Sequence, residues 1–192
     1  MDDDGRKIVG MFKQVRSFFE QVALLLQNLD DQFEKEGWKK DSNTVTSNTS
    51  QSLTNYRAWF PDYLFRFYRN NRISNILTFV SVLLDDDLDG EYKDKIEEPL
   101  MTAGCFVFDK NKKIVDDFAY WWAKWYGYYG DIKKLEHKIS TDNWKEEKEC
   151  NEYKFDDYAC FALPLVSIEN VQDVKEKVIK PLLDLISKYT RE

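Results

Sequence analysis

The feature that most constrains the fold is an unbroken apolar repeat over the first thirty-odd residues. Its members recur at alternating spacings of four and three: Ile8, Phe12, Val15, Phe19, Val22, Leu26, Leu29 and Phe33. This period predicts one amphipathic helix over about residues 5–36. Aspartates at positions 2–4 suit the positive end of the helix dipole, and Gly37 suits a left-handed C-cap.

The width of the apolar stripe indicates what the helix packs against. A mean spacing of 3.5 residues is that of a coiled-coil seam, but Val9, Phe18 and Leu25 widen the stripe beyond what one partner helix would cover. Wide stripes are typical of helices packed on their own domain, so we expect an intramolecular core. The alternative is a homodimer through residues 8–33.

Length and composition limit the class of protein. A chain of 192 residues fits one domain and can bury a substantial core, for which 16% aromatic residues are a generous supply. No apolar run approaches the roughly 18 to 20 residues that a membrane span needs. The first residues lack the basic and apolar parts of a signal peptide. We therefore expect a cytoplasmic protein without a membrane partner.

Three cysteines, Cys105, Cys150 and Cys160, are odd in number and lack paired CxxC spacing. This pattern favours reduced, buried thiols over a disulfide framework or a zinc site.

The order of predicted elements gives the fold class. We expect a single domain with an N-terminal helix within residues 1–40, a polar loop at 41–55, a sheet with a helical insertion at 56–166, and a C-terminal helix at 170–190. The class is α+β, with a mainly antiparallel sheet of four to five strands flanked by long N-terminal and C-terminal helices.

Strands are predicted at residues 62–69, 75–84 and 101–108, and a last one within 153–166. Pro61 could instead open a helix over the first of these segments. Gly104 indicates a bulge or a close backbone approach. Residues 115–126 fit either helix or strand.

Residue signals also mark the C-terminal helix. Asn170 is the expected N-cap, with Asp173 as its reciprocal partner in a capping box. Pro181 interrupts the apolar stripe of this helix and is expected to kink or divide it.

Most enzyme classes lack sequence support. The chain has a single histidine and no glycine-rich nucleotide-binding motif, so we expect no cofactor. Asp62, Glu91 and Lys93 do fit the spacing of the PD-(D/E)xK nucleases, in which two carboxylates hold Mg²⁺ and a lysine assists the attacking water. Glu91 and Lys93 lie in a polar run rather than on a buried strand. A metal-dependent nuclease or related hydrolase is therefore the alternative to a non-enzymatic protein.

The acidic run after residue 84 contains part of a calcium-loop pattern. Asp85, Asp87 and Asp89 take its alternate oxygen-ligand positions, and Gly90 follows at the turn. Position 12, where a bidentate glutamate belongs, is Ile96. We therefore expect an acidic hairpin loop and no metal.

The predicted binding residues come from two aromatic-rich segments, one at residues 56–72 and one that contains Trp121, Trp122 and Trp125. Residues 56–72 carry four arginines among seven aromatic side chains and only one acid, a pattern suited to anions and stacked rings. The predicted ligand or partner-binding residues are Arg66, Tyr68, Arg69, Trp121, Trp122 and Trp125. The arginines could instead pair with the acidic run at residues 85–98, and we favour this internal pairing.

These patterns predict a non-enzymatic binding or regulatory module that recognises a partner protein or a small anionic ligand. A net charge of −7 argues against nucleic acid as a partner, because such binding depends on phosphate neutralisation. The same charge leaves a second alternative, an acidic decoy of nucleic-acid-binding proteins.

Overall fold

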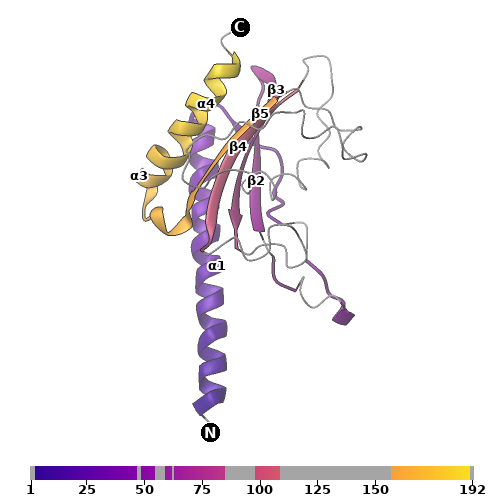
Figure 1. Cartoon of the computed structure of the whole chain (residues 1–192), viewed down its shortest axis with the longest axis vertical. Coiled ribbons are helices and arrows are strands. Elements are labelled where there is room, and N and C mark those ends of the chain that lie inside the picture. The colour runs from indigo at the N-terminus through magenta and orange to yellow at the C-terminus, as the bar shows by residue number, and fades with distance from the viewer. Residues whose placement is uncertain are drawn as a thin grey trace.

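The chain folds into one antiparallel sheet with helices on one of its faces (Figure 1). The computed structural model describes residues 3–46, 49–54, 59–61, 63–84, 98–108 and 157–190. Helix α1 spans Asp3–Lys35, and the C-terminal helical segment comprises α3 (Val171–Asp173), a π-helical turn (Val174–Ile179) and α4 (Lys180–Thr190). The predicted α+β class is confirmed.

The sheet has five strands in the order β1-β2-β3-β4-β5, and each neighbouring pair is antiparallel. The strands are β1 (Lys39–Lys40), β2 (Tyr63–Asn70), β3 (Ile73–Leu83), β4 (Leu100–Val107) and β5 (Asp157–Pro164). The four predicted strands are confirmed, including the one beside Pro61. Strand β1 was not predicted, because two lysines carry no strand pattern and owe their conformation to pairing with β2.

Successive side chains of β2 point to opposite faces of the sheet, and each face has its own buried core. Leu64 and Tyr68 belong to the core that contains the buried side chains of the helices. The intervening aromatic residues face the other way and meet neighbours on β3 and β4. Together they form a buried aromatic cluster of Tyr63, Phe65, Phe67, Phe79 and Phe106. Both faces of the sheet are therefore buried, and the helices that the structure describes lie over one of them.

At Gly104, on β4, the backbone of β5 and the ring of Phe79 approach the main chain closely. A Cβ there would lie 2.5 Å from the carbonyl oxygen of Ala159 and 2.8 Å from the ring of Phe79. The register through Gly104 is regular, so of the two predicted possibilities the close approach is confirmed and the bulge is not. Cys105 follows Gly104 on β4, and Cys160 is the residue paired with Gly104 on β5; both side chains are buried, while Cys150 lies outside the described residues.

Helix α1 ends as its glycine predicts. Gly37 has φ of 81°, its N–H donates to the carbonyl of Glu34 at 3.0 Å, and the N–H of Trp38 donates to the carbonyl of Phe33 at 2.9 Å. This pair of hydrogen bonds is the Schellman motif. It reverses the chain so that buried Trp38 joins the same core as Phe33 and β1 can pair with β2.

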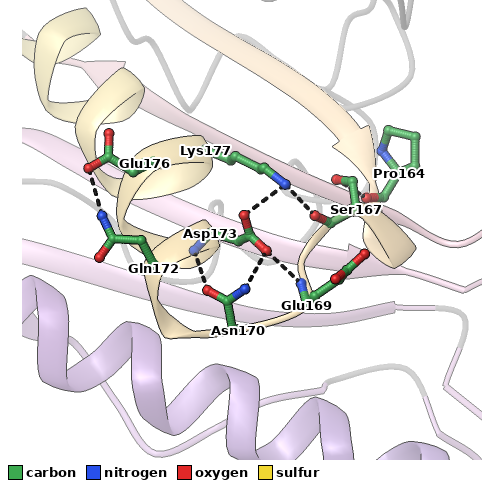
Figure 2. Close-up of polar contacts among 8 residues, drawn as sticks. All are labelled: Pro164, Ser167, Glu169, Asn170, Gln172, Asp173, Glu176 and Lys177. Carbon is green, nitrogen blue, oxygen red and sulfur yellow. Dashed lines mark hydrogen bonds and ion pairs between the residues drawn. The ribbon is translucent and has the colours of Figure 1, made fainter.

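The predicted N-cap of the C-terminal helix is confirmed (Figure 2). The Asp173 N–H donates to Asn170 Oδ1 at 3.0 Å, and Asp173 Oδ2 accepts from the backbone N–H of Glu169 and from Asn170 Nδ2. Lys177 Nζ lies 2.8 Å from Asp173 Oδ1 and donates to the carbonyl of Ser167 at 2.7 Å. The cap therefore also fixes the turn by which the chain leaves β5.

Of the two outcomes expected at Pro181, division of the helix is not found, because helical residues run without a gap from Val171 to Thr190, while a kink stays a prediction. Proline has no N–H to donate to the carbonyl four residues earlier, and its ring crowds that turn. The preceding residues widen into the π-helical turn, whose last bond runs from the Lys180 N–H to the carbonyl of Lys175. The widened turn accommodates Pro181. Val178, Leu182 and Leu185 consequently stay on one buried face.

Candidate functional site

Of the two predicted binding arginines, Arg66 is the more deeply buried. It lies on β2 between Leu64 and Tyr68, under α1, and its side chain is only 10% exposed. Its Nη1 donates to the carbonyls of Asn43 and Thr44 at 3.0 and 3.1 Å. Its Nε lies 3.4 Å from Asp30 Oδ1, close enough for an ion pair although without hydrogen-bond geometry.

Tyr68 faces the same helix, one alternation further along β2. Its ring stacks on Phe33, with the two centroids 4.0 Å apart, and its hydroxyl donates to Asp30 Oδ1 at 3.0 Å. Burial raises the pKa of Tyr68 far above its ordinary value, and the neighbouring Asp30 carboxylate raises it further. The hydroxyl therefore remains a neutral donor to the carboxylate.

Arg69 lies at the end of β2 beside β1. Its Nε pairs with Asp41 Oδ1, and the backbone of Asp41 also donates to the carbonyl of Phe67. Lys40 completes the arrangement by placing Nζ 3.6 Å from Asp30 Oδ2. The polar group under α1 thus consists of Asp30, Lys40, Arg66 and Tyr68, whereas Arg69 forms a separate pair with Asp41.

The structure gives both arginines carboxylate partners that the sequence did not predict. Asp30 on α1 faces Arg66, and Asp41 after β1 faces Arg69. Residues 85–97 of the acidic run lie outside the described residues, so pairing with that run stays a prediction. The guanidinium of Arg66 is also below the helix rather than on a solvent-facing side of β2. Chemically, the group joins α1 to the sheet, because each of its cations already faces a carboxylate of the same chain.

The other predicted site residues lie outside the described part of the chain. They are the tryptophans Trp121, Trp122 and Trp125, the nuclease-pattern residues Asp62, Glu91 and Lys93, and the calcium-loop aspartates Asp85, Asp87 and Asp89. The helix-or-strand question at residues 115–126 falls there too. Within the residues that the structure describes, no group of three or more His, Cys, Asp or Glu side chains could hold a metal ion.

The N-terminal half of α1 carries the first part of the predicted apolar stripe, and there the expected intramolecular core does not cover it. It extends beyond the end of the sheet (Figure 1). Its large apolar side chains are between 37% and 64% exposed, and we call them the exposed stripe: Ile8, Val9, Met11, Phe12 and Val15. From Val22 onward the same stripe is buried in the protein's own core.

The lengths of the predicted helix and strands could have indicated that α1 extends past the sheet. A helix of 33 residues is about 50 Å long at 1.5 Å per residue. Strands of 8 to 11 residues reach only about 26 to 36 Å. A sheet with strands of this length leaves one end of the helix uncovered.

No known protein family, curated protein or solved structure matches this chain. None of the helices in the described ranges is long and apolar enough to cross a membrane.

Proposed function

We propose that this protein is a non-enzymatic binding module that docks a partner protein through the exposed stripe of α1. The observation that carries the proposal is the contiguous set of large apolar side chains on one side of a projecting helix. Isolated exposed apolar residues are ordinary, but a contiguous patch on a projecting element is characteristic of an interaction surface. Helices that dock in this way present anchors at spacings of three and four residues, as Ile8, Phe12 and Val15 do.

The alternative ligand, a small anion bound by Arg66 and Arg69, has less support. Both guanidiniums face carboxylates of the same chain, and Arg66 also donates to two backbone carbonyls. An incoming anion would have to displace these contacts. A partner protein at the exposed stripe would displace only water.

Photocrosslinking in cells that make the protein natively would test the proposal. A benzophenone amino acid replaces Phe12 in the stripe or, as a matched control, Ser17, which is exposed on the opposite side of the helix. We expect a discrete protein adduct from position 12, identified by mass spectrometry of the crosslinked peptide, and none from position 17. Equal labelling from both positions, or no adduct from position 12, would contradict the proposal.

A further inference from the structure

The apolar stripe of α1 is one continuous surface with two different environments. Its spacing of four and three runs unchanged from Ile8 to Phe33. Val22, Leu26, Leu29 and Phe33 are at most 3% exposed, because β2–β5 and the C-terminal helices cover them. Phe18 and Phe19 are half-buried at the edge of that core, and the exposed stripe lies beyond them.

We infer that the exposed stripe binds the same stripe of a second copy of this chain, with the two α1 helices antiparallel. The inference rests on the proposed function, since it names the protein partner of that surface. The resulting dimer has two-fold symmetry, and each chain contributes the same patch to the interface.

The position of the sheet determines the direction of the pair. The sheet covers the same side of α1 that carries the exposed stripe, only further along the helix. In a parallel pair, both sheets would have to occupy the space between the two helices at the same level. In an antiparallel pair, each sheet lies beyond the N-terminus of the other chain, so the helices can approach.

The spacing of the stripe fits an antiparallel pair of matching length. Setting Ile8 of one chain opposite Phe19 of the other brings Phe12 opposite Val15, and two-fold symmetry repeats both layers. This gives four apolar layers, with Met11 and Phe18 at their flank. The N-terminus of each helix then ends near Val22 of the other chain, where that chain's own core begins to cover the stripe.

Charge favours a protein partner over a lipid surface. Arg6 and Lys13 fall on the side of the helix away from the stripe, so they do not oppose their counterparts across the pair. Residues 2–20 contain four acids and four bases, and the whole chain has a net charge of −7. A helix that binds an anionic bilayer typically has a strongly basic polar face, which this balance does not provide.

The available area reaches the minimum for a weak, reversible dimer. From their exposed fractions, the five side chains of the stripe offer about 500 Å² per chain, so a pair would bury at most about 1,000 Å², the threshold for a biological interface. Packing would also support the helix itself. Gly5 and Gly10 weaken this part of α1, and most helical stability in proteins comes from packing of an apolar face.

Sedimentation equilibrium of the purified full chain over a range of concentrations would test the inference. We expect a monomer–dimer equilibrium whose dissociation constant rises at least about 100-fold in the double variant Phe12→Glu, Val15→Glu, because carboxylates would be buried in the central layers. The control is Gln14→Glu, Ser17→Glu, with the same spacing and charge change on the exposed opposite side, and it should dimerise like the wild type. Far-ultraviolet circular dichroism would verify that both variants remain folded.

Disulfide trapping would test the direction of the pair. Ile8→Cys and Phe19→Cys are prepared separately, each with Cys150→Ser, and oxidised alone or mixed. An antiparallel pair brings positions 8 and 19 of different chains together, while identical positions lie about 16 Å apart at 1.5 Å per residue. We therefore expect dimer bands only from the mixture, whereas bands from either variant alone would overturn the antiparallel arrangement.

The remaining outcomes separate this inference from the proposed function. A chain that stays monomeric at all concentrations overturns the second-copy inference. If photocrosslinking at position 12 then captures a different protein, the proposed function survives. If position 12 captures nothing, both fail. Cosedimentation of wild-type protein with phosphatidylserine vesicles, lost in Phe12→Glu, Val15→Glu but retained in the control, would replace the second copy with a membrane surface.

Discussion

At the scale of single residues, Asp30 is the point where the N-terminal helix is joined to the sheet. Its carboxylate faces the Tyr68 hydroxyl, the Arg66 guanidinium and the Lys40 ammonium, and it is only 16% exposed. A carboxylate between several donors offsets the cost of burying Arg66, whereas removing it leaves a cation without its counter-charge.

We expect Asp30→Asn to lower the free energy of unfolding by about 1 to 3 kcal/mol, because Arg66 would keep its buried charge without a carboxylate. The control Asp31→Asn changes the adjacent, exposed residue and should cost less than about 0.5 kcal/mol. Urea denaturation would measure both. Adding Arg66→Met to Asp30→Asn should recover part of the lost stability. Equal destabilisation by Asp30→Asn and Asp31→Asn would contradict this account.

Two glycines should respond in opposite directions to alanine. At Gly104, a Cβ would meet the Ala159 backbone at 2.5 Å, so Gly104→Ala should destabilise the protein by about 1 to 3 kcal/mol. At Gly10, nothing lies within 4 Å of a Cβ, so Gly10→Ala should stabilise the helix by about 0.5 to 1 kcal/mol. The denaturation midpoints of the two variants would test both predictions. A stabilising effect of Gly104→Ala would show that β4 and β5 can move apart at this position.

At the scale of elements, α1 combines two functions in one helix. Its C-terminal half contributes to the core, where burying a leucine or phenylalanine side chain contributes about 1.5 to 3 kcal/mol. Its N-terminal half extends past the sheet and contributes no buried side chain to the described core. Stability and interaction should therefore be separable by mutation along this helix.

Two leucines on α1 provide a matched comparison. Leu26 is 3% exposed in the core, so Leu26→Ala should cost about 2 to 5 kcal/mol. Leu24 is 52% exposed on the opposite side, so Leu24→Ala should cost less than about 0.5 kcal/mol. Chemical denaturation at a fixed protein concentration would measure both, and similar costs would mean that the side of α1 assigned to the core is wrong.

The C-terminal helix should show a pH-dependent cap. The hydrogen bond from Lys177, followed by that from the Glu169 backbone, lowers the pKa of Asp173 below its ordinary value of 3.8. A depressed pKa means that the stabilisation is fully present above the unfolded-state pKa and is lost as the pH falls through the folded-state pKa. We expect the stability difference between wild type and Asp173→Asn to shrink from pH 7 to about pH 2. Lys177→Met should weaken the same dependence, and an unchanged difference would contradict the assignment.

At the scale of the whole molecule, the arginines Arg66 and Arg69 of β2 are paired with carboxylates of the same chain. Asp30 and Asp41 face Arg66 and Arg69, while the protein as a whole has a net charge of −7. A surface intended for phosphates would instead leave its cations available to a ligand.

Single-stranded oligonucleotide should therefore bind no better than background. Fluorescence anisotropy at two salt concentrations would measure this. We expect no salt-sensitive binding by the wild type and no change on Arg66→Ala, Arg69→Ala beyond a loss of stability. Tight binding that weakens with salt and disappears in the double variant would assign these arginines to a nucleic-acid surface.

The sequence by itself determined the elements whose signals are local. The stripe of α1, the Gly37 C-cap, the Asn170 N-cap and the four longer strands follow from periodicity and from residues with specific backbone roles, and the structure has each of them. Such signals depend on neighbours within a few residues, so they are present in the chain before it folds.

Only the tertiary structure decided which surfaces meet. Arg66 had a charge that needed a partner, but its pairing with Asp30 depends on α1 crossing β2. Strand β1 exists because β2 offers it an edge. The division of one uniform stripe at about Val22 into a buried and an exposed half depends on where the sheet ends. The periodicity of the sequence indicates which side of a helix is apolar. The length of the neighbouring sheet determines how much of that side is covered.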